Sequence, residues 1–317
     1  MKKTFLISFL LLIIGLVLFD NFWSNWLKKQ ISEKQIWILN KSNRHFNLAF
    51  IGSSRVYTCI NIDTVETKTG KSAINLGCDG ASVMENYVIL KQFLKAGNKI
   101  DSLYLQLDKS ALIDMNKAYS YPFHDYLFLN KLNEGEIEEA VVRCKGYLKY
   151  SFWRFLPYFK YAEFNNFYNL KIFFPFFNKK PAKPEFDSIT GSRLIDLQMP
   201  DSLLVKKNEK SFYEDGLAVS ETSILYINKI LALCKDNNIK CTFFKVPMYN
   251  NYNAKYSSSR ISEIFLIKFS KEHNCRFIDF QKLELAANIN FFKDYTHLNK
   301  NGADSFSVFL ADSLTRK

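Results

Sequence analysis

Short apolar runs recur along the chain, and between them apolar residues fall on one side of a helical pattern. The runs predict buried strands at Leu48–Ile51, Ala73–Leu76, Leu103–Leu107, Cys241–Val246 and Cys275–Phe280. Strands that alternate with helices are typical of a parallel α/β sheet. We therefore expect an α/β fold built on one parallel sheet.

The helical segments are marked by their apolar spacing and by their stop signals. A polar connector over Gln30–Arg44 precedes the first strand, and a helix runs from Ser82 to a stop at Gly97. Three later helices are predicted: one with Ile224, Ile227, Leu231 and Cys234 on its apolar face, one over Ser258–Lys271, and a last one with Phe306, Phe309, Leu310 and Leu314 on its apolar side.

The alternation breaks between residues 111 and 211, so we predict that this stretch is an insertion that divides the α/β domain into residues 30–110 and 212–317. Tyr147–Phe177 contains fifteen aromatic residues, and Lys179–Pro184 reads as a linker. Two interpretations stay open. The insertion is a mainly helical lid with a small core of its own, or part of it lies on the membrane or on a membrane partner.

The first 29 residues combine a basic start, an apolar run and an aromatic belt. Lys2 and Lys3 precede the run Phe5–Phe19, and three aromatic residues follow it, which are Phe22, Trp23 and Trp26. This layout predicts a transmembrane signal anchor over residues 1–29, with the rest of the chain on the periplasmic or extracellular side. A cleaved signal peptide is the alternative, but no small-residue pair suited to cleavage follows Phe19.

The formal net charge is +12, from 43 Lys and Arg against 31 Asp and Glu. The basic residues are scattered, which favours a membrane surface or anionic glycans over nucleic acid as the partner. None of the six cysteines forms a Cys-x-x-Cys pair, and no Cys/His group has zinc-ligand spacing, so we expect neither a metal nor a cofactor. An oxidising compartment would permit a disulfide such as Cys234 with Cys241, although the sequence leaves the pairing open.

Two polar stretches follow predicted strands, one directly and one just before the last helix, and sites in open α/β sheets form beyond strand ends. Gly52-Ser53-Ser54-Arg55 follows the first strand, although this tetrapeptide alone is ordinary turn chemistry. Asp294 and His297 lie three positions apart between the last strand and the last helix. A serine nucleophile needs a base, and a histidine base needs a carboxylate that holds its tautomer. Ser54, His297 and Asp294 are therefore candidate catalytic residues; a helix-entry turn with a surface histidine is the alternative for the second stretch.

Three blocks together resemble the SGNH (GDSL-like) hydrolases: Gly52-Ser53-Ser54, Asn75 to Gly80, and Asp294-x-x-His297-Leu298. Their order and their places relative to the strands match that family over residues 46–110 and 212–315. The first block is closer to the membrane-anchored branch that acts beside membrane-bound O-acyltransferases in teichoic-acid D-alanylation and alginate-type O-acetylation. The resemblance implies a three-layer, flavodoxin-like parallel sheet.

The resemblance also implies a role for each residue of the site. Ser54 is the expected nucleophile, His297 its base, and Asp294 the partner that orients the base. The amides of Ser54 and Gly80 are expected to hold the oxyanion. A glycine at position 80 has a physical reason, because its amide must approach the reacting carbonyl closely.

One position departs from the family pattern. The third block normally supplies an Asn side chain to the oxyanion hole, and here Asp108 follows the third strand. An ionised carboxylate cannot donate a hydrogen bond, and loss of one oxyanion donor costs about 10² to 10³ in rate. Asn86 is the candidate substitute donor, and Arg55 is expected either to orient an anionic substrate or to pair with Asp108. Asn75 and Gly77 are expected to form turns.

The expected function is serine-dependent ester hydrolysis or O-acyl transfer on a cell-envelope or extracellular glycan, with a membrane-bound O-acyltransferase as a candidate partner. The alternative is a catalytically weak SGNH-like scaffold that binds glycan or assists such an acyltransferase, and the missing third-block Asn supports it. A basic membrane-surface adaptor that works through the aromatic segment is a further alternative. The sequence leaves open the acyl group, the acceptor and the direction of the reaction.

Overall fold

The computed structural model describes residues 2–28, 33–112, 135, 138–139, 142, 146–155, 186–200, 219–249 and 260–315. The chain divides into two compact units, one formed by residues 1–35 and 120–183 and the other by residues 36–119 and 184–317. The predicted linker Lys179–Pro184 and the larger part of the aromatic segment, residues 156–177, lie outside the described residues.

The second unit, hereafter the α/β unit, is built on a five-stranded parallel sheet of order β2-β1-β3-β4-β5. Its strands are β1 (His45–Ile51), β2 (Ala73–Asn75), β3 (Lys99–Gln106), β4 (Lys240–Lys245) and β5 (Arg276–Asp279). This order is one of the two common ones for doubly wound sheets, in which ligands bind beyond the carboxyl ends of the strands. The prediction of an α/β fold on one parallel sheet is confirmed.

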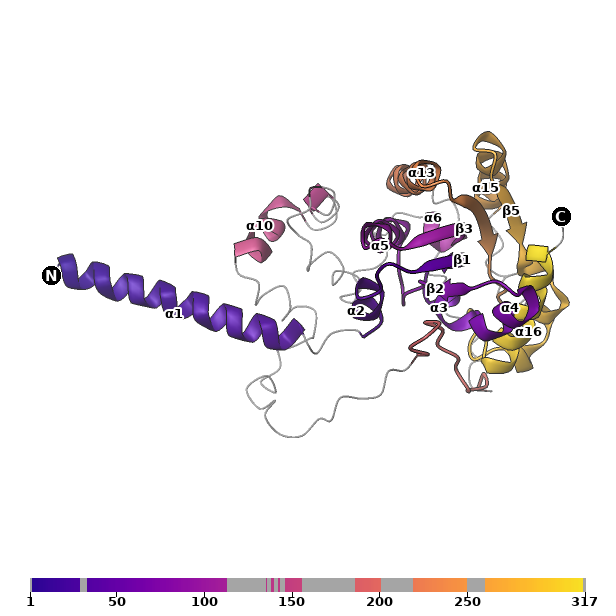
Figure 1. Ribbon diagram of the computed structural model, residues 1–317, viewed down its shortest axis with the longest axis horizontal. Coiled ribbons are helices and arrows are strands. Elements are labelled where there is room, and N and C mark those ends of the chain that lie inside the picture. Colours follow the sequence, from indigo (N-terminus) through magenta and orange to yellow (C-terminus); the bar gives the residue numbers. More distant parts are fainter. Residues whose placement is uncertain are drawn as a thin grey trace. The chain divides into compact units, whose positions relative to one another are not determined.

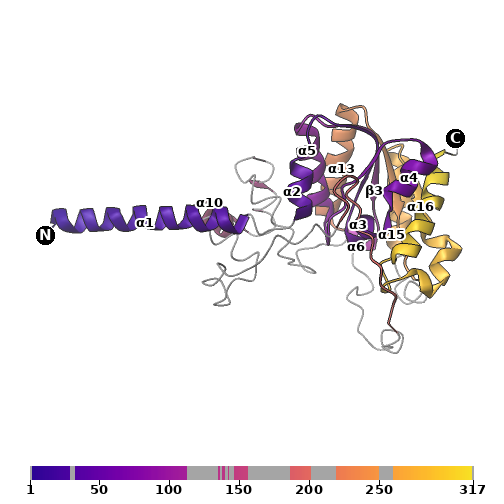
Figure 2. The ribbon, with the colours of Figure 1, turned by 60° about the horizontal axis from the view of Figure 1, so that its bottom comes forward.

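Helices cover both faces of this sheet (Figures 1 and 2). On one face α5 (Val83–Lys95) packs against α13 (Glu221–Asp236), and α15 (Arg260–Glu272) contacts β5. On the other face α16 (Lys300–Thr315) packs against both α3 (Ser54–Cys59) and α4 (Ile62–Thr69). The helices predicted at these places are confirmed, and α2 (Glu33–Leu39) occupies the middle of the predicted connector.

The start and the end of α5 follow from local chemistry. The Ser82 hydroxyl accepts from the Glu85 amide (3.3 Å), and the Glu85 carboxylate accepts from the Ser82 amide (2.6 Å), which is a complete capping box. Gly97 follows the helix with a φ of 81°, a conformation that favours glycine. The predicted start at Ser82 and stop at Gly97 are therefore confirmed.

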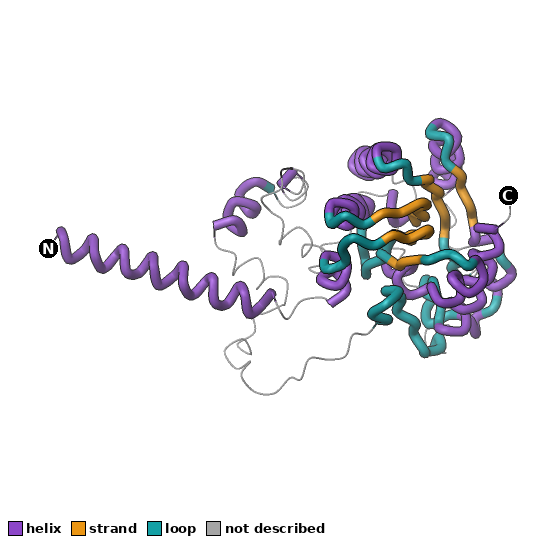
Figure 3. Tube along the Cα trace, viewed as in Figure 1, coloured by secondary structure: helices purple, strands orange, loops and turns teal. Residues whose placement is uncertain are grey.

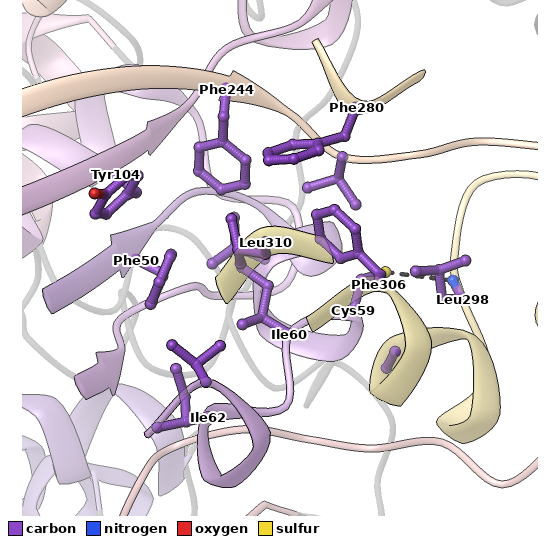
Figure 4. Packing of buried hydrophobic residues seen from close by; sticks show 14 of the residues in the cluster. Phe50, Cys59, Ile60, Ile62, Tyr104, Phe244, Phe280, Leu298, Phe306 and Leu310 are labelled. Atoms are coloured by element: carbon purple, nitrogen blue, oxygen red, sulfur yellow. Dashed lines mark hydrogen bonds between the residues drawn. The ribbon is translucent and has the colours of Figure 1, made fainter. Parts of the chain in front are cut away.

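The core between the sheet and α16 is rich in phenylalanine. Phe50 of β1 and Phe244 of β4 have their rings 6.4 Å apart, and Phe280 lies edge-on to Phe306 of α16 at 5.2 Å. All four are at most 5 % exposed, and Figure 4 shows them with Leu310. Burial of these rings fixes α16, and the loop that leads into it, against the sheet.

Residues 186–200, here called the strap, return from the insertion and contain neither helix nor strand (Figure 3). Their backbone bonds to three separate parts of the α/β unit: Asn75 N to Thr190 O (2.9 Å), Met199 N to Phe292 O (2.9 Å) and Lys300 N to Ile195 O (2.8 Å). Residues 186–200, which were predicted to belong to the insertion, are thus part of the α/β unit.

The first unit contains α1 (Lys2–Lys28) and α10 (Tyr147–Phe155). Lys3–Phe22 has a mean hydropathy of 2.4 and is long and apolar enough to cross a membrane. In α10, Tyr150 and Trp153 are buried, whereas Leu148 and Phe155 are exposed. The described end of the aromatic segment is therefore an amphipathic helix with apolar side chains left at its surface.

Candidate active site

Ser54 is the first residue of α3 and directly follows the turn at the carboxyl end of β1. Ser53 caps the helix, because its carbonyl accepts from the amide of Val56 (3.0 Å) and its hydroxyl accepts from the amide of Arg55 (3.5 Å). A Cβ at Gly52 would lie 2.5 Å from the side chains of both Gln106 and Val56, so only glycine fits there. Sterically, the turn can pass this close to β3 only with glycine at position 52.

Gln106, at the end of β3, holds the serine turn from the side. Its carboxamide oxygen accepts from the amide (2.9 Å) and from the hydroxyl (3.0 Å) of Ser53. Its amide nitrogen donates to the carboxylate of Asp108 at 2.5 Å, and Asp108 also pairs with Arg55. Gln106 was not among the predicted site residues, although a polar residue inside the apolar run Leu103–Leu107 was an available signal.

The loop after β2 is tied to the same turn. Cys78 donates its amide to the carbonyl of Gly52 (3.1 Å), and the Asn75 side chain donates to the carbonyl of Val56 (2.8 Å). The Asn75 side-chain oxygen in turn accepts from the amide of Gly77 (2.9 Å). The turn-forming role predicted for Asn75 and Gly77 is confirmed by these contacts.

Gly80 lies at the tip of this loop with a φ of 63°, in the left-handed region that favours glycine. Within the described part of the chain, neither the Gly80 amide nor the Ser54 amide donates to another residue. The Ser54 amide belongs to the first turn of α3, whose N–H groups have no intrahelical acceptor. Neither amide is therefore committed to a protein acceptor, and the Ser54 amide lies at the serine itself.

Ser54, His297 and Asp294 lie in one hydrogen-bonded row, although 243 positions separate the serine from the histidine. Ser54 Oγ is 2.7 Å from His297 Nε2, and His297 Nδ1 is 2.9 and 3.0 Å from the two carboxylate oxygens of Asp294. An ionised Asp294 holds the proton on Nδ1, so that Nε2 accepts from the serine hydroxyl. The three predicted residues are therefore brought together in the geometry of a nucleophile, a base and an orienting carboxylate.

The acidity of Asp294 follows from its surroundings. Burial alone would raise the pKa of Asp294, but hydrogen bonds and charge from His297 and hydrogen bonds from Thr296 hold that pKa well below its usual range. Thr296 supplies its amide (2.9 Å) and its hydroxyl (3.0 Å), and the His297 amide adds a further bond (2.9 Å). Asp294 is therefore ionised at neutral pH. Thr296 was missed by the sequence analysis, because its role depends on contacts within the turn.

The core sets the distance between the two ends of this row. Leu298, next to His297, is fully buried and donates its amide to the sulfur of Cys59 at 3.3 Å (Figure 4). Cys59 is the last residue of α3, the helix that begins with Ser54. Burial raises the pKa of the Cys59 thiol to about 11, so the sulfur acts here as a neutral packing group. This hydrogen bond thus joins the segment that carries His297 to the far end of α3, the helix that begins with Ser54.

The remaining predicted residues divide into a pair and an isolated side chain. Arg55 and Asp108 form a buried ion pair, 6 % and 4 % exposed, which is one of the two roles expected for Arg55. Asp108 accepts hydrogen bonds in this pair and so does not act as an oxyanion donor. Asn86, on α5, is 2 % exposed, and none of the described contacts links its side chain to Ser54 or Gly80.

Among the described residues, no group of three His, Cys, Asp or Glu side chains is arranged to hold a metal ion. No protein-family model matches the chain, and no significant match to a curated protein is found.

Proposed function

We propose that this chain is a membrane-anchored serine esterase or O-acyltransferase of the SGNH type that acts on a cell-envelope or extracellular glycan. The observation that carries the proposal is the hydrogen-bonded row Ser54–His297–Asp294. Its contacts are 2.7 Å between Ser54 and His297 and 2.9 Å between His297 and Asp294, although Ser54 and His297 are 243 positions apart in the sequence. Hydrogen bonds of this length are those needed for general-base activation of a serine.

In the proposed reaction, Ser54 Oγ attacks the ester carbonyl while His297 Nε2 takes the hydroxyl proton. The amides of Ser54 and Gly80 donate to the oxyanion of the tetrahedral intermediate. His297 then returns the proton to the departing alcohol, which leaves an acyl group on Ser54. Water or a glycan hydroxyl attacks this acyl-serine, again with His297 as base, and the choice of acceptor decides between hydrolysis and transfer.

Features other than the row Ser54–His297–Asp294 support the proposed SGNH type and the proposed attachment to a membrane. The sheet order β2-β1-β3-β4-β5 is the flavodoxin-like one that the resemblance implies, and the candidate residues follow β1, β2 and β5 at its carboxyl edge. The apolar helix α1 supports attachment to a membrane. The proposal includes an α/β unit on the periplasmic or extracellular side, where a membrane-bound O-acyltransferase is the candidate partner.

A catalytically weak scaffold that binds glycan is the second candidate. The pairing of Asp108 with Arg55 favours it, because a carboxylate stands where the family normally has an oxyanion donor. In this reading the two remaining amide donors give slow turnover or none. The two candidates differ in whether Ser54 is activated.

The test uses the full chain in detergent with a serine-directed fluorophosphonate probe and a small acetyl ester. Labelling and turnover should fall by about 10³-fold or more in Ser54→Ala and in His297→Ala, because each removes an essential part of one unit. The double variant should be little worse than either single variant. Ser305→Ala, on the partly exposed side of α16, is the matched control and should keep both activities.

Asp294→Asn should lose less labelling and turnover than Ser54→Ala or His297→Ala, because a fraction of the His297 side chains still has the required tautomer. Thermal melting serves as the folding control for every variant. If Ser54→Ala keeps its turnover, or if the wild-type protein is not labelled by the probe, the serine is not the nucleophile and the scaffold becomes the better account.

A further inference from the structure

Three of the described cysteines meet at the end of the sheet opposite to Ser54. Cys234 lies near the end of α13, Cys241 near the start of β4, and Cys275 directly before β5. The neighbouring Cys234 and Cys275 thiols, together with burial, raise the pKa of the Cys241 thiol well above its usual value, so the three thiols lie close together. Parallel strands begin at one edge of a sheet and end at the other, so this thiol cluster and the candidate active site occupy opposite edges.

The register of β4 and β5 shows how Cys241 and Cys275 face each other. Lys245 pairs with Asp279 and Phe243 with Phe277 along the two strands. The Lys245 ammonium lies 3.4 Å from the Asp279 carboxylate and 5.8 Å from the Phe277 ring, so these side chains share one face. Two residues further back on the same face, this register matches Cys241 with Cys275.

Neighbouring strands put matched Cα atoms about 4.8 Å apart, which lies inside the range of about 4.4–6.8 Å that a disulfide spans. Cys241 and Cys275 are both partly exposed, whereas Cys234 is only 2 % exposed. A dissolved reagent therefore reaches the strand pair before it reaches the helix cysteine. The cysteine pairing that the sequence suggested, Cys234 with Cys241, is the less accessible one.

The two partly exposed thiols are not equivalent. The neighbouring Cys241 thiol lowers the pKa of the Cys275 thiol, although partial burial opposes this shift. Cys275 also donates to the carbonyl of His273 at 3.5 Å. A thiol with a lowered pKa forms its thiolate more readily and is the first to attack a disulfide.

We propose that Cys241 and Cys275 form a disulfide bond between β4 and β5 by exchange with an external disulfide, either a small molecule or a thiol–disulfide oxidoreductase. The Cys275 thiolate attacks one sulfur of the external disulfide, whose S–S bond breaks and releases one thiol. Cys241 gives up its proton and attacks Sγ of Cys275, which releases the second thiol. Two protein thiols are oxidised, one external disulfide is reduced to two thiols, and the protons end on those thiols.

The test exposes the reduced full chain in detergent to oxidised glutathione, blocks free thiols under denaturing conditions, and maps the unreduced peptides by mass spectrometry. The wild-type protein should yield a peptide that joins Cys241 to Cys275, while Cys59 and Cys78, both buried, remain alkylated. Cys234→Ser should yield the same joined peptide, and Cys275→Ser should yield none at this position.

Two results overturn the proposal. In one, Cys241 and Cys275 stay alkylated or carry only separate glutathione adducts. In the other, the joined peptide links Cys234 to Cys241. The readout does not depend on catalysis, so it stands whether or not Ser54 proves to be a nucleophile.

Discussion

At the scale of single residues, the contact between Ser54 and His297 depends on side chains that need not touch a substrate. Gln106 is the clearest of these, because one carboxamide joins the Ser53 backbone, the Ser53 hydroxyl and the Asp108 carboxylate. The residue has no reactivity of its own. Its contribution is the position of the turn that carries Ser54.

Gln106→Leu tests this positioning role. The variant leaves the Ser53 amide without its acceptor and Asp108 without one donor, which should lower the free energy of unfolding by about 1–3 kcal/mol. The rate at which a fluorophosphonate labels Ser54 should fall at least about tenfold, measured at a temperature where the variant is fully folded. An unchanged labelling rate beside reduced stability would give Gln106 a structural role only.

The depressed pKa of Asp294 predicts a pH dependence of stability. Its pKa is lower in the folded chain than the value of about 3.9 in the unfolded chain, so its ionised form stabilises the fold above that pH. As the pH falls from there towards the folded pKa, this contribution is lost at about 1.4 kcal/mol per pH unit. Urea unfolding of the wild type and of Asp294→Asn should therefore show a difference that shrinks below about pH 4. A difference that is constant from pH 6 to pH 3 would contradict this assignment.

At the scale of elements, α16 links the core to the histidine loop. The helix packs on α3 and α4, and its first turn approaches the preceding 3₁₀ turn η5 (Ile289–Phe291). A Cβ at Gly302 would overlap the backbone carbonyl of Phe291, which cannot move aside as a side chain can. The position of α16, and with it that of His297, thus requires glycine at this point.

Gly302→Ala should push α16 away from η5 and lower the free energy of unfolding by about 1–3 kcal/mol. Denaturant unfolding measures this change, and Ser305→Ala in the same helix is the control that should leave stability nearly unchanged. Equal stability of the two variants would mean that the helix start adapts without cost.

The elements also show which parts of the fold the sequence could predict. Buried runs such as Leu48–Ile51 were found because strands covered on both faces are apolar throughout. β3 begins at Lys99, four residues before the predicted start at Leu103. The earlier start was not predicted because the first half of the strand alternates exposed and buried residues and so shows no apolar run. The strap could not be predicted, since its order comes from hydrogen bonds to distant segments and leaves no periodic pattern. Reactive residue types revealed Ser54, which follows β1, and His297, which lies in the loop before α16.

At the scale of the whole molecule, the two units suggest a division between membrane attachment and chemistry. The unit with α1 also contains α10, whose Leu148 and Phe155 are exposed. The α/β unit contains every residue of the candidate site. α1, in the same unit as this amphipathic aromatic helix, is long and apolar enough to cross a membrane, and the proposed membrane-facing role of the insertion rests on this pairing.

A reporter fused after Lys317 tests the predicted orientation. A fluorescent or enzymatic reporter that is active only in the cytoplasm should stay silent, and one that is active only outside it should give signal. Membrane fractions should retain the fusion protein, which distinguishes an anchor from a cleaved leader. Cytoplasmic activity would reverse the orientation and would remove envelope glycans as substrates.

Other segments of the chain cover the β2 edge of the sheet. The two β2 amides that point away from β1 are satisfied, Ala73 by the carboxylate of Glu66 (2.7 Å) and Asn75 by the carbonyl of Thr190 in the strap (2.9 Å). Exposed edge amides offer a template on which a second chain can add a strand, and such additions seed aggregation. Glu66 and the strap therefore cover the β2 edge, where a second chain could otherwise add a strand. A shortened chain that lacks the insertion but keeps residues 186–200 should remain monodisperse, whereas one that also loses them should precipitate.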